Sequence, residues 1–222
     1  LYATLLMPFW DKNPGVQVMI NQMLASNDKR LKYNTAMLLL RNKKHVPDTL
    51  LNYFAKLDDY RYTLYSDLKE YKLLNLFPVA YHNQADLAKS KILGMSSSYD
   101  KPDSMVFIDK LPVQYKERSG YVYFFKYKKK KDDSDWNLAS VGIVSADPKE
   151  FEFPKKQNYF EELQYGFTHL AAGKIEEDEP MMDQLKKALK KMQYSKRNSA
   201  SEFYNDEDRG RMDLFQSINF RD

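Results

Sequence analysis

The chain has 222 residues, of which 43% are hydrophobic and 14% aromatic, so it is long enough and apolar enough to fold around a substantial core. Its 35 basic and 31 acidic residues give a formal charge of +4, which is too balanced to attract the whole protein to nucleic acid or to an anionic membrane. The absence of cysteine excludes disulfides, thiolate nucleophiles and thiolate metal sites.

The first ten residues, LYATLLMPFW, contain no initiator methionine, no basic leader and no apolar run long enough to cross a bilayer. This beginning indicates a part of a longer polypeptide, and it predicts no membrane span.

Between residues 14 and 77 the apolar residues follow helical spacing, and two successive helical pairs overlay at a shift of 31 positions. The apolar set Met19, Ile20, Met23, Leu24 and Met37 matches Leu50, Leu51, Phe54, Ala55 and Leu68, and the turn residues Asn27, Asp28 and Arg30 match Asp58, Asp59 and Arg61. Pro14 and Pro47 are expected to open the two units, and Asp28 and Asp59 to cap their second helices.

This pattern resembles HEAT-like α-helical repeats over residues 14–77. The resemblance implies that an Asp and an Arg near each turn brace one unit against its neighbour, here Asp28 with Arg30 and Asp59 with Arg61. Repeat arrays need about three units or more, so residues 1–10 are expected to end an earlier unit, or residues 79–93 to supply a closing helix, or both. A chance overlap of two ordinary helical hairpins is the alternative.

The segment GMSSSYDKPDS at 94–104 loses the helical period and predicts a linker. Beyond it a period of two predicts antiparallel strands at 105–115, 120–128 and 136–145, with a fourth short strand at 151–153. Two helices should follow. The first ends near Gly173 and faces inward with Phe160, Leu163, Phe167 and Leu170, and the second starts at Pro180 and faces inward with Met182, Leu185, Leu189 and Met192.

The expected fold class is therefore α+β: a helical-repeat segment at 1–94, an antiparallel sheet with covering helices at 105–194, and a polar tail at 195–222 that ends in a docked turn or short helix.

The stretch GYVYFFKYK at 120–128 has two apolar faces when read as a strand. One face carries Tyr121, Tyr123, Phe125 and Tyr127, and the other carries Val122, Phe124 and Lys126. Such a strand is typical of the middle of a sheet covered on both faces, whereas a base-stacking platform would show one polar face. The RNA-recognition consensus is approached but missed at Val122 and Lys126.

Lysines 128–131 could neutralise phosphates, but Asp132, Asp133 and Asp135 follow at once, which favours a solvated hairpin turn. A nucleic-acid-binding module remains the alternative function, and it would use the aromatic strand with Lys126, Lys128, Lys129, Lys130 and Lys131.

Motifs for catalysis and cofactors are missing from the sequence. His45, His82 and His169 lie too far apart for an HExxH-type metal site, and no glycine-rich phosphate loop or GxSxG elbow occurs. No cofactor, metal ligand or catalytic residue is therefore predicted. A dispersed enzyme site near His82, in AYHNQAD, is the second alternative.

The sequence favours a non-enzymatic protein-interaction or scaffold module that binds another protein or another domain of the same polypeptide. Arginine and tyrosine are common interface anchors, so the candidate contact residues are Arg30, Tyr33, Arg61, Tyr62 and Tyr65. Bracing neighbouring repeats is their alternative role.

A second resemblance covers GYVYFFKYK and the following WNLASVGIVSADP, which look like a strand pair in the C-terminal region of large bacterial envelope proteins that carry TraB/GumN-type domains. It implies a bacterial, extracytoplasmic setting. No activity carries over, because the motifs of that domain type are absent from the sequence.

Overall fold

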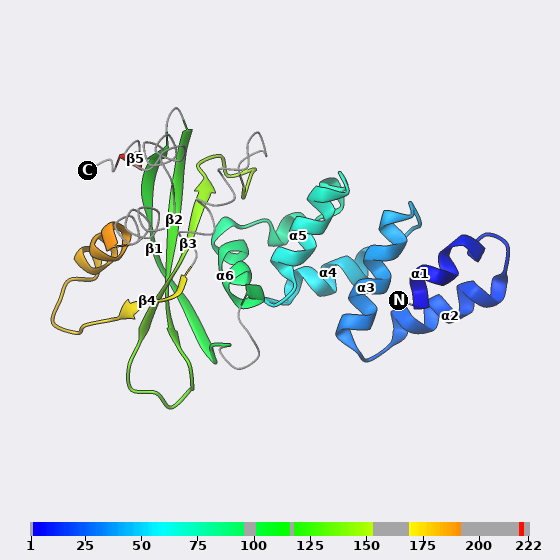
Figure 1. Ribbon diagram of the computed structural model, residues 1–222, viewed down its shortest axis with the longest axis horizontal. Helices are drawn as coiled ribbons and strands as arrows, with labels where there is room; N and C mark the ends of the chain where they lie inside the picture. The colour runs from blue at the N-terminus through cyan, green and yellow to red at the C-terminus, as the bar shows by residue number, and fades with distance from the viewer. Residues whose placement is uncertain (1, 96–100, 116–117, 153–168, 192–217, 220–222) are drawn as a thin grey trace, which may run out of the picture. The chain divides into compact units, whose positions relative to one another are not determined.

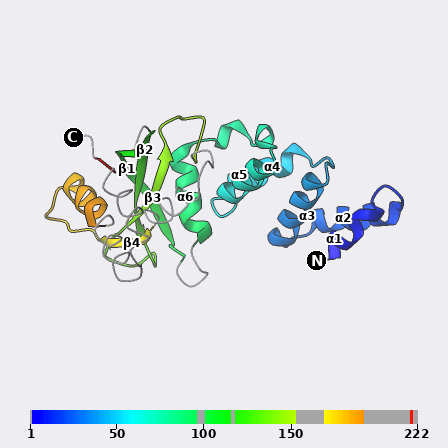
Figure 2. The same cartoon turned by 45° about the horizontal axis from the view of Figure 1, so that its top comes forward.

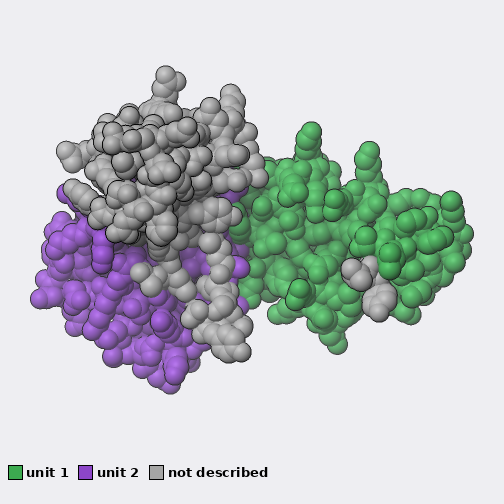
Figure 3. Space-filling view, viewed as in Figure 1, with its two compact units in different colours: residues 1–81 green, residues 82–222 purple. Residues whose placement is uncertain are grey.

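The computed structural model describes residues 2–95, 101–115, 118–152, 169–191 and 218–219 (Figure 1). The chain forms two compact units, Leu1–Tyr81 (unit 1) and His82–Asp222 (unit 2), which Figure 3 colours separately. Unit 1 is helical and unit 2 contains an antiparallel sheet, so the α+β class is confirmed. The boundary lies at Tyr81, ahead of the predicted linker at 94–104. Within the described ranges, no helix combines the length and the apolar character needed to cross a membrane.

Unit 1 contains the two helical pairs that the periodicity predicts, because α2 packs on α3 and α4 packs on α5. Its elements are α1 (Tyr2–Leu6), η1 (Met7–Phe9), α2 (Pro14–Ala25), α3 (Lys29–Arg41), α4 (Asp48–Lys56), α5 (Arg61–Glu70), η2 (Leu74–Leu76) and η3 (Val79–Tyr81). The matched positions Ile20 and Leu51 are both buried, whereas Met19 is 48% exposed. The overlay thus locates the inward faces of both helical pairs. The inward face of the first pair is less completely buried.

The starts of these helices follow the local chemistry of the sequence. Pro14 is the first residue of α2, where a missing N–H costs nothing, and Asn13 Oδ1 accepts a hydrogen bond from the Gly15 N–H at 2.9 Å. Asp28 caps α3 as predicted, since its Oδ1 accepts from the N–H groups of Arg30 and Leu31 at 2.9 and 3.1 Å. The corresponding prediction for Asp59 is wrong, because Tyr60 occupies the N-cap of α5 and no side chain caps that helix.

The second helices of both pairs end in the same turn. The backbone enters the left-handed region at Lys43 (φ 57°) after α3 and at Lys72 (φ 59°) after α5. The N–H groups of this lysine and of the next residue donate back to the last helical turn: Lys43 to Leu40 (2.9 Å), Lys44 to Leu39 (2.9 Å), Lys72 to Lys69 (3.1 Å) and Leu73 to Leu68 (2.7 Å). Both ends are Schellman motifs with lysine where glycine is usual, a similarity that the apolar overlay does not contain.

Tyr33 joins the two pairs. Its ring packs edge-on against Phe54 of α4 at 5.0 Å between centroids, and its hydroxyl donates to Asp67 Oδ2 of α5 at 2.6 Å. Burial is the main cause that raises the pKa of both Tyr33 and Asp67. The contact between the pairs therefore combines an aromatic core with a polar brace.

Unit 2 has a five-stranded antiparallel sheet in the order β4-β3-β2-β1-β5. The strands are β1 (Ser104–Tyr115), β2 (Arg118–Lys128), β3 (Asn137–Ser145), β4 (His169–Lys174) and β5 (Ile218–Asn219). The first three confirm the predicted strands, and β2 occupies the centre of the sheet.

Three predictions for this unit need correction. Phe151 and Glu152 form a bend and not a fourth strand. Residues 169–174, assigned to the end of a helix, are strand β4, because a short apolar run does not reveal its period and pairing with β3 satisfies its backbone. The docked end of the tail is strand β5, which pairs with Gln114 and Tyr115. Residues 160–168, 195–217 and Met192 lie outside the described residues.

The sheet is covered on both faces, by α6 (Gln84–Met95) on one and by the helix over residues 181–191 on the other (Figures 1 and 2). Leu185 and Leu189 of the latter helix pack with Val122 and Phe124 in one core cluster, as predicted. Met182, predicted to face inward, is 40% exposed. Helix α6 packs against β3, so the helix proposed to close the repeats belongs to unit 2.

Polar contacts attach α6 to the sheet at its first residue. The amide nitrogen of Gln84 lies 2.9, 2.9 and 2.7 Å from the carbonyl oxygens of Ser145, Asp147 and Glu150. Its amide oxygen accepts from the Tyr123 hydroxyl at 2.8 Å. One glutamine side chain thus joins the start of α6, strand β2 and the loop that follows β3.

Candidate functional site

The aromatic residues of β2 are part of the core. Tyr123, Phe124, Phe125 and Tyr127 are each at most 3% exposed, on a strand of the sheet that α6 and the helix over 181–191 cover on its two faces. The prediction of a central strand covered on both faces is confirmed. Rings buried to this degree are not accessible for stacking on bases.

The lysine hairpin between β2 and β3 is a turn in which aspartate side chains accept backbone hydrogen bonds from Lys130 and Lys131. The Lys126 and Lys128 ammonium groups lie 4.7 and 5.1 Å from the centroid of the Trp136 ring. Lysines 129–131 are exposed, and the backbone N–H of Lys130 donates to Asp133 Oδ2 at 2.9 Å. These lysines remain at the surface, where they could still contact nucleic acid. The aromatic strand β2, which the nucleic-acid alternative also uses, is buried.

Three of the five predicted partner contacts are structural. Tyr33, Arg61 and Tyr65 are 5%, 6% and 1% exposed. The guanidinium of Arg61 donates to the carbonyl oxygens of Ala55 (2.8 Å) and Lys56 (3.1 Å) and to Asp58 Oδ1 (2.7 Å), so it braces the turn between α4 and α5. The surface retains Arg30, which is exposed, and Tyr62, which is half-buried.

His82 precedes α6 and is half-buried. Its neighbour Asn83 accepts hydrogen bonds from the N–H groups of Ala85 and Asp86, which places it at the start of α6. In the part of the chain that the structure describes, no three His, Asp or Glu residues are grouped to hold a metal ion. An enzyme site at His82 stays a prediction.

A groove in unit 1 was not found by sequence reasoning. It has a volume of about 490 Å³, and we call it the unit 1 groove; it is lined by Leu40, Arg41, Lys43, Lys44, His45, Val46, Asp48, Leu51, Tyr71, Leu73 and Leu76. These residues come from the ends of α3 and α5, from the segment between α3 and α4, from the first turn of α4, and from η2 and the residue before it. Both Schellman turns thus contribute to its lining.

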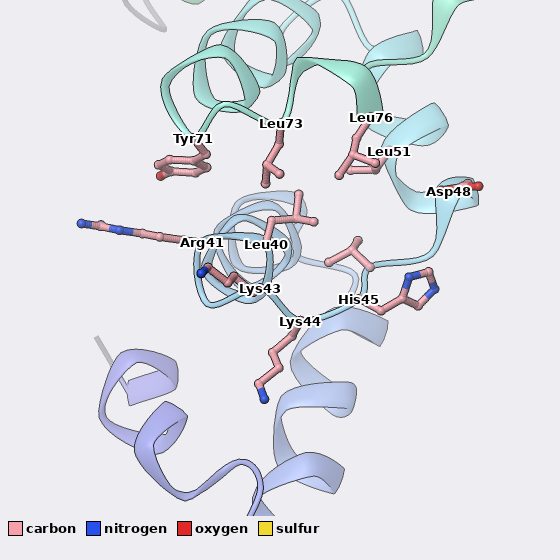
Figure 4. A pocket seen from close by; sticks show the side chains of 11 residues that line it. Leu40, Arg41, Lys43, Lys44, His45, Asp48, Leu51, Tyr71, Leu73 and Leu76 are labelled. Carbon is pink, nitrogen blue, oxygen red and sulfur yellow. The ribbon is translucent and has the colours of Figure 1, made fainter.

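The floor of the groove is apolar. Figure 4 shows Leu40, Leu51, Leu73 and Leu76 pointing toward one another. Leu40 and Leu51 are buried, whereas Leu73 and Leu76 are half-buried and so keep apolar surface in contact with water.

The charged residues of the rim are Arg41, Lys43, Lys44 and Asp48. Arg41, Lys43 and His45 are exposed, and Figure 4 shows Arg41 and Lys43 at one end of the groove and Asp48 at the other. The Lys44 ammonium is bound by both carboxylate oxygens of Asp11 at 2.8 Å, so its charge is compensated.

Tyr71 forms the wall beside Arg41, whose guanidinium carbon lies 6.0 Å from the ring centroid. Burial, assisted by the nearby Asp67, raises the pKa of the Tyr71 phenol, so this wall is uncharged at neutral pH.

The net positive charge of the protein comes from unit 1. Residues 1–81 contain 11 Lys and Arg residues against 7 Asp and Glu residues, a surplus equal to the +4 of the whole chain. The stretch RNKKH at 41–45 supplies three of these cations. In the sequence, the only signal of a groove is that RNKKH and KLLNL at 72–76 each follow the second helix of a helical pair.

Comparisons of the chain with protein-family models, with curated proteins and with solved structures gave no match.

Proposed function

We propose that the protein is a non-enzymatic protein-interaction module, in which HEAT-like helical pairs form the scaffold and the unit 1 groove is the binding surface. One observation carries this proposal: the groove combines a leucine floor, partly exposed to water, with charges confined to its rim. Burying apolar surface beneath a polar rim is the usual anatomy of a protein interface.

The chemistry of the lining favours a polypeptide over a small metabolite. Small-molecule sites place a few polar groups among apolar walls to orient the ligand. Here Leu40, Leu51, Leu73 and Leu76 make the floor, and the cations sit on long side chains at the edge. An amphipathic segment that inserts apolar side chains and leaves its polar face at the rim suits such a groove.

The proposal is tested by capture on the immobilised protein, with proteins retained from its own cell extract identified by mass spectrometry. The test variant is Leu73→Glu, which places a charge on the groove floor, and the matched control is Val79→Glu at a site 88% exposed. We expect a protein retained by the wild type and by Val79→Glu and lost with Leu73→Glu.

Leu76→Ser is a milder second variant, and circular dichroism checks that each variant is folded. Equal retention by all folded variants would contradict the proposal. Capture that depends on nuclease-sensitive material and is lost in Lys129→Glu with Lys130→Glu would replace it with the nucleic-acid alternative.

A further inference from the structure

We infer that the unit 1 groove binds a segment of a partner protein in which carboxylates stand next to a large apolar side chain. This inference rests on the proposed function and specifies the chemistry of the partner. The apolar side chain occupies the leucine floor, and the carboxylates lie over Arg41 and Lys43.

Charge complementarity carries the choice of an acidic segment. Arg41 and Lys43 are exposed and lie at the same end of the groove, and unit 1 holds the whole positive surplus of the chain. Lys44 contributes little, because Asp11 already binds its ammonium. The guanidinium of Arg41 can also pair with a carboxylate through two parallel hydrogen bonds.

The turn after α3 reduces the repulsion that a helix C-terminus exerts on a carboxylate. The carbonyl oxygens of Leu38, Leu39 and Leu40 all accept hydrogen bonds from the N–H groups that follow the helix. Carbonyl groups at an open helix C-terminus would repel a carboxylate, but here the Schellman turn occupies them.

Asp48 gives the groove a polarity. It lies at the end opposite Arg41 and Lys43, where it disfavours a second carboxylate (Figure 4). The segment should therefore carry its acids on one side of the apolar anchor and uncharged or basic residues on the other.

The experiment uses a library of random peptides, selected on the immobilised full chain and counter-selected on Leu73→Glu. We expect the groove-dependent peptides to be enriched in Asp or Glu beside Leu, Ile, Met or Phe. An enriched peptide labelled with fluorescein should bind Arg41→Glu with Lys43→Glu about tenfold more weakly than the wild type, which corresponds to about 1.4 kcal/mol. Its affinity should also fall with added salt.

Lys29→Glu with Lys32→Glu is the matched control, because it reverses two charges at the other end of α3. The inference is overturned if groove-dependent peptides are basic or uncharged, if no peptide is enriched, or if the control weakens binding as much as the test pair. A partner captured by the wild type that is lost with Leu73→Glu but retained by Arg41→Glu with Lys43→Glu would leave the proposed function standing and remove the inference alone.

Discussion

Strand β2 and the unit 1 groove place their apolar side chains in opposite settings. The rings of Phe124 and Phe125 are at most 1% exposed at the centre of a covered sheet, whereas Leu73 and Leu76 stay half-buried in an open groove. The most aromatic stretch of the chain therefore serves stability, and a modest stretch that follows two helix ends forms the candidate binding surface. The most conspicuous stretch of the sequence is therefore not the candidate binding surface.

The largest effect expected from this comparison is on the core of unit 2. Phe124→Ala removes a fully buried ring and should lower the free energy of unfolding by about 3–5 kcal/mol. Trp10 lies in unit 1 and Trp136 in unit 2, so urea unfolding followed by fluorescence in a Trp10→Phe background reports unit 2. Phe107→Ala, at a site 43% exposed, is the control, and an equal loss from it would contradict the central-core assignment.

The polar brace of unit 1 should have the next largest effect. Tyr33→Phe removes the hydroxyl that donates to Asp67 and leaves that carboxyl without this donor, at a cost of about 1–3 kcal/mol. Tyr53→Phe, at a site 38% exposed, should change stability by less than about 0.5 kcal/mol. Urea unfolding followed by Trp10 fluorescence in a Trp136→Phe background measures both, and similar values would argue against the brace.

The same brace predicts a pH dependence. Burial raises the pKa of Asp67 in the folded state above its ordinary value of 3.8, so unit 1 loses stability as pH rises from 3.8 through the folded pKa. Asp67→Asn removes this titration and keeps an acceptor for Tyr33. The stability of Asp67→Asn relative to wild type should therefore increase with pH across that window, by at most about 1.4 kcal/mol per pH unit. A difference that is constant with pH would refute the assigned cause.

The smallest effect concerns the turns that border the groove. Lys72 adopts the left-handed backbone conformation, which costs a residue with a side chain about 1–2 kcal/mol. Glycine does not have this cost, but it loses more backbone entropy on folding, so only part of the energy is regained. Lys72→Gly should therefore stabilise unit 1 by about 0.5–1 kcal/mol. Lys56→Gly, in the last turn of α4, should instead destabilise it by up to about 1 kcal/mol. Two shifts of the same sign would contradict the assignment of the turn.

Local sequence patterns predicted where helices and strands lie better than they predicted which of them pack together. The period of two located β1, β2 and β3, and the position of Asp28 predicted the cap of α3. The packing of α6 on β3 could not be predicted, because an amphipathic helix does not specify the surface that it covers.

The groove escaped sequence reasoning for a similar reason. Arg41 and Leu73 are 32 positions apart, and their proximity depends on two left-handed turns at lysines, where the sequence shows no glycine. The sequence left two roles open for Tyr33 and Tyr65, partner contact or bracing, because tyrosine is common both at interfaces and in cores; both residues are buried.

The bonds of Gln84 set an order for assembly during synthesis. Helix α6 is made before its partners, the carbonyls of Ser145, Asp147 and Glu150, which follow about 60 residues later. Residues 1–81 contain their own packing partners and can fold as they emerge, whereas α6 must wait for β3. A ribosome stalled before residue 145 would thus present a folded unit 1 followed by an amphipathic helix that has not yet met its partner strand β3.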